Sequence, residues 1–181
     1  MDSMKWEIIK SCYPLLSKWL KVRMDHVRMP SGHEMEDFYV IESSDWVNVI
    51  AITDDNHFVL EKQYRHGIQK VCYETPAGCV DAGEDPMVAA KRELFEETGF
   101  GGGSWEYFSY TAPNASGMNN YAHTFIARGV SKIAQPYTEA SEDIEVVIVS
   151  KKELLALLES HCIIEADLVA ALYQYLYEYE R

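Results

Sequence analysis

Glu93, Glu96 and Glu97 are spaced so that a helix would carry three carboxylates on one side. At about 3.6 residues per turn they share an arc of about 100°. Like charges three and four positions apart repel, costing roughly a few tenths of a kcal/mol per pair, so helix stability does not favour this pattern. A hard divalent cation reverses the sign of the interaction, because Mg²⁺ takes oxygen ligands. The alternative is an ordinary solvated acidic face, partly neutralised by Lys91 and Arg92.

The helix that carries these glutamates has well-marked ends. Asp85 is a suitable N-cap, Pro86 suits the first helical position, and Gly99 stands where a left-handed C-terminal cap is expected. We therefore predict a helix over 86–98. Its predicted apolar side consists of Met87, Ala90, Leu94 and Thr98, with Val88 and Phe95 beside them.

A longer register of fixed positions surrounds the three glutamates. Five residues separate Gly78 from Glu84, and seven more precede the run Arg92-Glu93-Leu94-Phe95-Glu96-Glu97-Thr98-Gly99-Phe100. This segment matches the Nudix box, G-x5-E-x7-R-E-U-x-E-E-x-G-U with U apolar, at every specified position. So many fixed positions in one register make chance agreement improbable. The chain therefore resembles the Nudix hydrolases.

The Nudix resemblance implies an α/β (α+β) fold, an αβα sandwich with a mixed β-sheet. It also implies that the loop and helix bind Mg²⁺ or Mn²⁺ and that the enzyme cleaves a nucleoside diphosphate linked to another group. Glu84 and Arg92 would fix the loop against the helix. The metal ligands that the resemblance implies are Glu93 and Glu97, with Glu96 and the carbonyl of Ala77 as additional ligands.

Segments outside the box resemble the ADP-ribose and ADP-sugar pyrophosphatase branch, and the likeness covers roughly residues 29–181. In that branch the loop before the last strand supplies a catalytic acid, for which Glu142 is our first choice and Glu139 our second. Two positions depart from the branch: Asn114 stands where it usually has Gly, and Ala140 where some relatives have an acid. The matching segments are Gln63-Tyr64-Arg65, Glu74-Thr75-Pro76-Ala77-Gly78, Pro113 and Glu142-Asp143-Ile144-Glu145-Val146.

The reaction that this branch implies converts a nucleoside diphosphate sugar to a nucleoside monophosphate and a sugar phosphate. Metal ions bound to both phosphates would neutralise charge, orient the phosphates and acidify a water. Nucleoside triphosphates or dinucleoside polyphosphates are alternative substrates for the same chemistry. A noncatalytic nucleotide-sensing module is an alternative of another class. Such modules usually lose box glutamates, and this chain has lost none.

Several side chains outside the box are candidates for substrate binding, each with a structural alternative. Arg65 and Glu74 are placed to contact phosphate and ribose, or else to pair with each other. Trp46 would stack on a nucleobase or belong to the core as the first residue of a buried strand. His66 and His123 are weaker candidates, because isolated histidines usually have no catalytic role.

The bulk composition fits one globular domain with a short extra element. The chain has 181 residues, of which 48% are hydrophobic and 12% aromatic. With 16 basic and 29 acidic residues the formal charge is -13, which disfavours nucleic acid and anionic membranes as partners. A small phosphorylated substrate remains compatible, because divalent cations can lie between carboxylates and phosphate oxygens.

The compartment that we expect is the cytoplasm. The N-terminus lacks a basic region followed by an apolar run, and no apolar stretch approaches the roughly 18 residues of a membrane span. The cysteines are scattered without a C-x-x-C pair or a zinc-like spacing, and we interpret them as reduced thiols. They are Cys12, Cys72, Cys79 and Cys162.

Residues 1–44 are expected to form an N-terminal β-rich element that precedes the main domain. It combines an amphipathic piece over 8–20 with a strand-like run over 19–29, and the turn signal Pro30-Ser31-Gly32 leads to a second strand over 36–41. Together these predict a β-hairpin. Such an appendage often packs against a partner subunit, so we expect a homodimer.

Residues 45–181 are expected to form the Nudix domain. Asp54-Asp55-Asn56 supplies a turn between the first two strands, and Gly101-Gly102-Gly103 a turn after the acidic helix. Ser150 and Glu153 predict a capping box that starts a helix, and a last, Tyr-rich helix is predicted over 165–179. Strands are predicted over 46–53, 58–64, 71–75, 105–111, 121–127 and 144–149.

Overall fold

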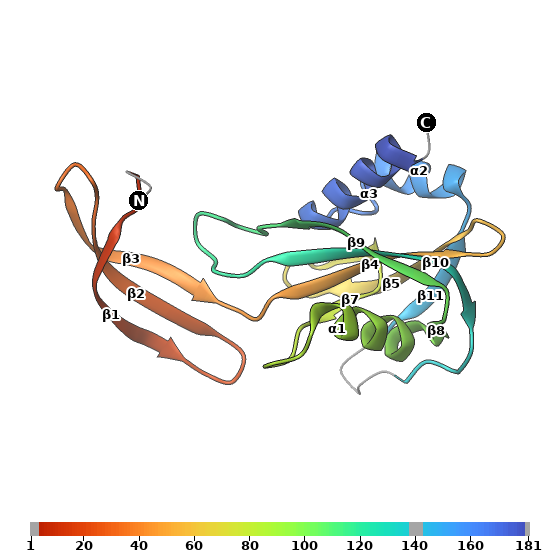
Figure 1. Cartoon of the computed structure of the whole chain (residues 1–181), viewed down its shortest axis with the longest axis horizontal. Helices are drawn as coiled ribbons and strands as arrows, with labels where there is room; N and C mark the ends of the chain where they lie inside the picture. Colours follow the sequence, from red (N-terminus) through yellow and green to blue (C-terminus); the bar gives the residue numbers. More distant parts are fainter. Residues whose placement is uncertain (1–3, 138–142, 180–181) are drawn as a thin grey trace. The chain divides into compact units, whose positions relative to one another are not determined.

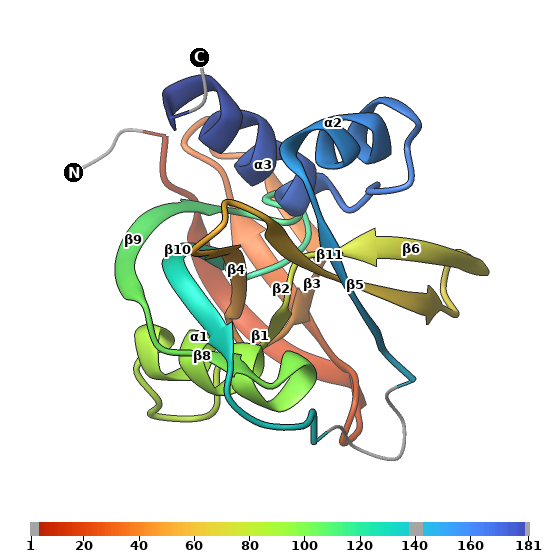
Figure 2. The ribbon, with the colours of Figure 1, turned by 90° about the vertical axis from the view of Figure 1, so that its right-hand side faces the viewer.

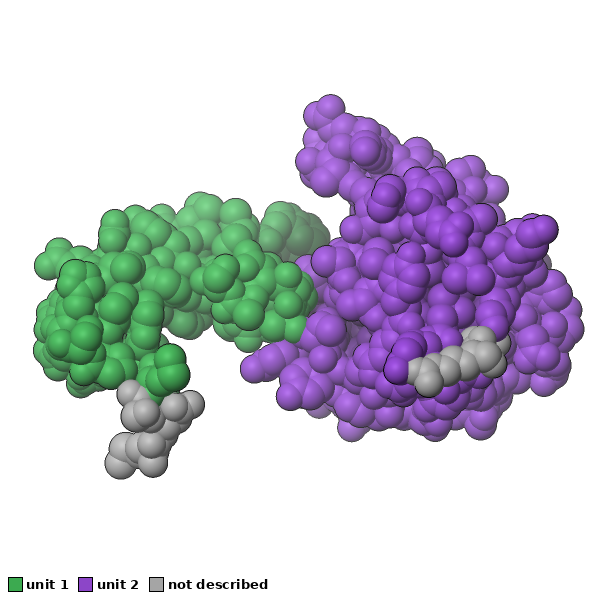
Figure 3. All heavy atoms as spheres, turned by 90° about the horizontal axis from the view of Figure 1, so that it is seen from above, with its two compact units in different colours: residues 1–44, 112–120 green, residues 45–111, 121–181 purple. Residues whose placement is uncertain are grey.

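The computed structural model describes residues 4–137 and 143–179 of the chain. These residues form two compact units, shown in different colours in Figure 3. Unit 1 combines residues 1–44 with residues 112–120, and unit 2 combines residues 45–111 with residues 121–181.

Unit 1 is built on a three-stranded antiparallel sheet in the order β1-β2-β3 (Figure 1). Strands β2 (Lys21–Arg28) and β3 (Glu34–Glu42) are the predicted hairpin, with Gly32 at φ 86° in the turn. Strand β1 (Glu7–Leu16) adds a third strand, so the prediction of an amphipathic piece over 8–20 is wrong. All ten residues of β1 are exposed, whereas an amphipathic segment would bury one side.

The 112–120 loop joins unit 1 through hydrogen bonds with the end of β3 and the residue that follows it. The N–H of Ile41 donates to the carbonyl of Gly117 at 2.8 Å, and the N–H of Ser43 donates to Oδ1 of Asn119 at 3.0 Å. The sequence offered no periodicity that would assign this loop to the N-terminal element.

Unit 2 contains an eight-stranded mixed sheet, as the resemblance implied. The main path runs β11-β5-β4-β10-β8, and β6, β7 and β9 pair with β5, β4 and β10. Strands β4 and β10 are parallel, and the other pairs are antiparallel. The strands are β4 (Trp46–Thr53), β5 (Phe58–Arg65), β6 (Lys70–Glu74), β7 (Ala77–Cys79), β8 (Phe100–Gly101), β9 (Ser104–Thr111), β10 (Ala122–Lys132) and β11 (Glu145–Val149).

Helices cover both faces of this sheet, which gives the expected αβα sandwich. Helix α1 (Pro86–Glu93) and its π-helical continuation η1 (Leu94–Thr98) lie on one face, and α2 (Lys151–Glu159) and α3 (Ala166–Tyr179) lie on the other (Figures 1 and 2). Each interface is a separate apolar cluster. The α1-side cluster includes Val47, Val49, Ala51, Val59, Ala89, Ala90 and Leu94, and the α3-side cluster includes Ile50, Ile52, Phe58, Leu60, Leu168, Leu172 and Tyr175.

The acidic helix begins and ends where the sequence predicted. Oδ1 of Asp85 accepts a hydrogen bond from the N–H of Met87 at 2.8 Å, and Gly99 closes the helix at φ 73°. The sheet-facing side is centred on Ala89, Ala90 and Leu94, which are fully buried. Because the helix turns these three residues toward the sheet, two residues predicted beside the apolar side are exposed instead. They are Val88 and Phe95.

The two C-terminal helices follow their sequence signals. Oγ of Ser150 accepts from the N–H of Glu153 at 3.3 Å, and the N–H of Ser150 donates to Oε2 of Glu153 at 2.7 Å, which completes the predicted capping box. The Tyr-rich stripe of α3 is buried as far as Tyr175, and Tyr179 stacks on it at 5.4 Å between ring centroids. Within the described residues, no helix is long and apolar enough to cross a membrane.

Candidate active site

One cavity in unit 2 gathers most of the residues that the sequence singled out. It has a volume of about 1030 Å³ and is lined by the box helix, by strands β4 to β7 and by the connection between α2 and α3. Residues more than a hundred positions apart in the chain therefore share one surface. The predicted site residues that line it are Trp46, Arg65, Glu74, Ala77, Glu93, Glu96 and Glu97.

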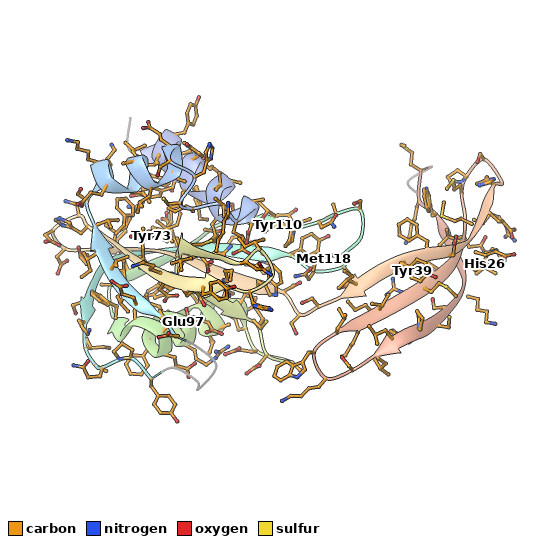
Figure 4. The ribbon with its side chains drawn as sticks, turned by 180° about the vertical axis from the view of Figure 1, so that it is seen from behind. His26, Tyr39, Tyr73, Glu97, Tyr110 and Met118 are labelled. Carbon is orange, nitrogen blue, oxygen red and sulfur yellow. The ribbon has the colours of Figure 1, made fainter. Side chains whose placement is uncertain are left out.

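Strand β7 packs closely against the box helix. A Cβ atom on Gly78 would lie 2.2 Å from Cδ of Glu93, so a side chain at this position would collide with the Glu93 carboxylate. The backbone N–H of Ala77 donates to Oε2 of Glu97 at 3.0 Å. Glu97, labelled in Figure 4, is 6% exposed. The glycine that opens the box therefore leaves room for the Glu93 carboxylate, which would have to move if this position carried a side chain.

Arg92 ties the loop to the helix, as the resemblance implied. Its Nε donates to Oε1 of Glu84 at 3.0 Å, its Nη2 to Oε2 at 2.9 Å, and its Nη2 also reaches the carbonyl of Cys79 at 3.1 Å. Its Nη1 donates to Glu93 at 2.7 Å and lies 3.4 Å from Glu96. The hydrogen bonds from Arg92 lower the pKa of Glu84, and the pKa of Arg92 is raised in turn.

Glu61 is a buried acid beside the box that the sequence reasoning missed. It lies on β5 directly opposite Glu74 on β6, and it is 1% exposed. Burial raises the pKa of Glu61 well above its usual range, and the neighbouring Glu97 carboxylate raises it further. The available signal was an acid that directly follows the apolar run Phe58-Val59-Leu60.

Arg65 and Glu74 pair with each other. Nε of Arg65 donates to Oε1 of Glu74 at 2.8 Å and to Oε2 at 3.0 Å, and Nη2 also contacts Oε2. The Glu74 side chain is buried, whereas the Arg65 side chain is 44% exposed. The structure therefore shows the alternative in which Arg65 and Glu74 pair with each other. The guanidinium of Arg65 still has an accessible surface in the cavity.

Part of the cavity is lined by β4 and by the start of α3. Nδ2 of Asn48 donates to Oδ2 of Asp167 at 3.0 Å, and both residues are buried. Glu165 is exposed as a residue, but the surrounding protein partly shields its carboxyl from water and raises its pKa, and the charge of Asp167 adds to the effect. Sequence reasoning missed all three, although Asn48 stands out as an amide within an apolar strand. Trp46, at the start of the same strand, is partly buried rather than a core residue.

The remaining candidates fall in different places. His66 lines the cavity, whereas His123 is not among the described residues that do. Nε2 of His123 lies 3.2 Å from Oδ2 of Asp45. Glu142 and Glu139, predicted as catalytic acids, lie outside the described residues. Tyr137, just before that segment, lines the cavity and donates its N–H to the carbonyl of Glu96 at 2.7 Å.

The box residues have the ligand chemistry that a divalent cation requires, although they do not form a preorganised metal-binding site. Among the described residues, no three Asp, Glu, His or Cys side chains converge as preformed metal ligands. Arg92 instead holds two of the carboxylates, those of Glu93 and Glu96. The donor set is nevertheless all oxygen, and buried Oε1 of Glu61 has no hydrogen-bond partner. Hard cations such as Mg²⁺ and Mn²⁺ fit this set.

Comparisons with known proteins agree with this site. The chain is 36% identical to a methanol dehydrogenase activator from Bacillus methanolicus over 113 residues, which cover 62% of this chain and 60% of that protein. It is 29% identical to an ADP-ribose pyrophosphatase from Bacillus subtilis (strain 168) over 180 residues, or 97% and 95% of the two chains. A crystal structure described as an ADP compounds hydrolase has the same fold, with a TM-score of 0.83 at 23% identity over 96% of this chain and 95% of that one.

The family assignment rests on most of unit 2. The NUDIX domain model matches residues 44–172, a span that contains the complete box, every strand of the mixed sheet and every described residue that lines the cavity. The residues that the box predicts as metal ligands all line that cavity. The chain therefore belongs to the Nudix hydrolase family.

Proposed function

We propose that this chain hydrolyses the pyrophosphate bond of ADP-ribose or a related nucleoside diphosphate sugar, giving a nucleoside monophosphate and a sugar phosphate. The observation that carries the proposal is the single cavity that holds the box carboxylates together with Arg65, Glu74 and Trp46. Its volume of about 1030 Å³ is at the upper end of the usual range for small-molecule sites, about 300–1,000 Å³, and suits a two-part ligand. Several relatives are named ADP-ribose pyrophosphatases.

The proposal includes a divalent cation, Mg²⁺ or Mn²⁺. Glu93, Glu96, Glu97 and the carbonyl of Ala77 would hold it. When bound, it supplies charge neutralisation for the pyrophosphate oxygens and makes a nearby water more acidic. The hydrogen bond from the Ala77 N–H already holds Glu97 against the loop that carries this carbonyl.

The other residues of the cavity bind and orient the substrate in this proposal. Arg65 donates hydrogen bonds to a phosphate with the part of its guanidinium that faces the cavity, and Glu74 keeps that guanidinium in place. Trp46 stacks on the nucleobase. Glu142, or Glu139 as the second choice, takes the proton from the attacking water.

We also propose that the chain forms a homodimer through unit 1. Strand β1 has no buried residue, and several of its exposed side chains are large and apolar. Such a surface on a small element favours burial against a second copy. Light scattering coupled to gel filtration tests the proposal, and a monomeric mass at micromolar concentration would reject it. The apolar side chains are Ile8, Ile9, Tyr13, Leu15 and Leu16.

The test of the activity is a substrate panel. The purified full-length chain is incubated with MgCl₂ or MnCl₂ and with ADP-ribose, other nucleoside diphosphate sugars, nucleoside triphosphates and dinucleoside polyphosphates, and the products are separated by ion-exchange chromatography. We expect AMP and ribose phosphate from ADP-ribose. No turnover of any nucleoside diphosphate sugar would eliminate the proposal, and turnover of triphosphates alone would favour the alternative substrate class.

A pair of variants shows whether the turnover comes from this cavity. Glu97→Gln is expected to lower kcat by a factor of about 10² or more without unfolding the chain. Glu159→Gln is the control, because this glutamate lies on α2, is exposed and is not a cavity residue. Equal activity in Glu97→Gln and the wild type would refute the role of Glu97 as a metal ligand.

A further inference from the structure

Glu61 occupies a position where the fold alone calls for an apolar side chain. It follows three buried residues on β5 and is itself 1% exposed. Its Oε1 atom is buried without a hydrogen-bond partner. Removing a carboxyl oxygen from water without a partner carries a large free-energy cost, which valine or leucine would avoid. Stability therefore does not explain an acid at this position.

The Glu61 side chain faces the box helix. Val59, two positions earlier on β5, belongs to the α1-side cluster, whereas Leu60 belongs to the α3-side cluster, so strand alternation turns Glu61 toward α1 and η1. The opposing strand agrees. Tyr73 packs against the α3-side cluster (labelled in Figure 4), so the next residue, Glu74, points to the same face as Glu61.

Glu61 therefore lies on the same face as Glu74 and next to Glu97 of η1, although the three carboxyls are not placed as a preformed metal cage. Glu74 on β6 is the direct cross-strand partner of Glu61, and the Glu97 carboxyl on η1 lies within hydrogen-bond reach of it. Each of these two acids has a donor: Arg65 for Glu74, and the N–H of Ala77 for Glu97. Oε1 of Glu61 has none. A cation at this point would supply the missing partner.

We propose that Glu61 is an additional carboxylate ligand for the divalent cation of the site, contributed by the sheet while the box ligands come from the helix. The inference rests on the proposed metal-dependent function. The competing interpretation is a neutral, protonated Glu61 that donates a hydrogen bond to Glu97 and has a structural role. Glutamine separates the two, because its amide can still donate to Glu97 but cannot act as an anionic ligand.

The experiment measures binding of MnCl₂ alone to the metal-free, full-length chain by isothermal titration calorimetry, with Mn²⁺ electron paramagnetic resonance to count bound ions. Glu61→Gln is expected to bind Mn²⁺ at least about tenfold more weakly than the wild type. Asp167→Asn is the matched control, since Asp167 is a buried acid that lines the cavity and whose oxygen already has Asn48 as a partner. Its Mn²⁺ affinity should stay within about twofold of the wild type. The thermal midpoint of metal-free Glu61→Gln should equal or exceed that of the wild type.

Three outcomes contradict the proposed role of Glu61. If Glu61→Gln binds Mn²⁺ as tightly as the wild type, Glu61 makes a structural hydrogen bond and is not a ligand. If the metal-free variant does not fold, Glu61 is needed for folding even without a cation. An equal loss in Asp167→Asn shows a general effect of cavity charge. A wild-type chain that binds Mn²⁺ but does not hydrolyse ADP-ribose rejects the proposed substrate and leaves the Glu61 result valid.

Discussion

Arg92 binds both carboxylate oxygens of Glu84, at 3.0 Å from Nε to Oε1 and 2.9 Å from Nη2 to Oε2. Glu84 also accepts from the N–H of Asp81 at 3.1 Å, so the loop before α1 is joined to the end of that helix by one planar ion pair. The pair sets the position of the loop, and β7 at its start carries Ala77 and Gly78.

Glu84→Gln is expected to reduce the free energy of unfolding by about 1–2 kcal/mol, because it removes a charge-assisted, two-point contact in a half-buried position. Urea unfolding measures this loss. Glu145→Gln is the matched control: its pair with Lys62 is more exposed, and a clearly smaller loss is expected. Equal losses in the two variants would show that Glu84 does not fix the loop.

Gly78→Ala is expected to lower kcat by a factor of about 10² while the fold is retained, because the new Cβ would displace the Glu93 carboxylate. Steady-state kinetics and circular dichroism check the two parts. Gly67→Ala is the control at another glycine of the same cavity, where no atom lies within 4 Å of the added Cβ. If both variants keep wild-type kcat, the position of Glu93 is not critical for turnover.

Arg65→Ala should both destabilise the chain and raise KM, because it leaves the buried Glu74 carboxylate without its partner and removes a proposed phosphate contact. A loss of about 2–3 kcal/mol in unfolding free energy is expected for this half-exposed pair. The double variant Arg65→Ala/Glu74→Gln should recover most of the stability, since the unpaired charge is gone, and should keep the raised KM. If KM returns to the wild-type value together with the stability, Arg65 has a structural role alone.

Glu165→Gln should change how stability depends on pH. The surrounding protein partly shields the Glu165 carboxyl from water and raises its pKa above the ordinary value of 4.5. Between that value and the raised one, the folded chain therefore holds a proton that the unfolded chain has lost. Wild-type stability therefore falls as pH rises through this interval, and the variant lacks that loss. In urea unfolding of the metal-free chain, the unfolding free energy of the variant should rise relative to that of the wild type between pH 4 and pH 7.

Glu153→Gln is expected to change the pH dependence of stability in the opposite direction. Hydrogen bonds from Ser150 lower the pKa of Glu153, so its contribution is present above its ordinary value of 4.5 and is lost as pH falls through the lowered one. This variant should therefore be less stable than the wild type at pH 7, and the difference should shrink in acid. If both variants shift in the same direction, general charge repulsion explains the Glu165 result.

The sequence was sufficient for the features that depend on neighbouring residues. Asp85, Gly99 and the capping box at Ser150 mark helix ends through local hydrogen bonds and backbone angles, and the structure confirms them. The resemblance to the Nudix box likewise implied that Glu84 and Arg92 fix the loop against the helix, and the structure shows their ion pair.

The features that sequence reasoning missed depend on contacts between distant segments. The proposed role of Glu61 depends on Glu74 and Glu97, which lie on other elements. Its neighbours along the chain are those of an ordinary apolar strand. Val88 was placed on the wrong side because the orientation of the helix depends on which of its residues fit against the sheet, and apolar character alone does not identify them. Strand β1 forms because β2 offers it a pairing edge.

The parallel pairing of β4 with β10 has a consequence for how the chain folds during synthesis. Trp46 pairs with Ala122 and Thr53 with Val130, so the central strand lacks one neighbour until the ribosome has passed residue 130. By then the box loop and helix have already emerged. Long-range parallel pairing is slow to form, because a long loop must close first. We therefore expect the box helix to form before β4 has its full set of neighbouring strands. The pairing of β10 with β4 should then limit the folding rate of unit 2.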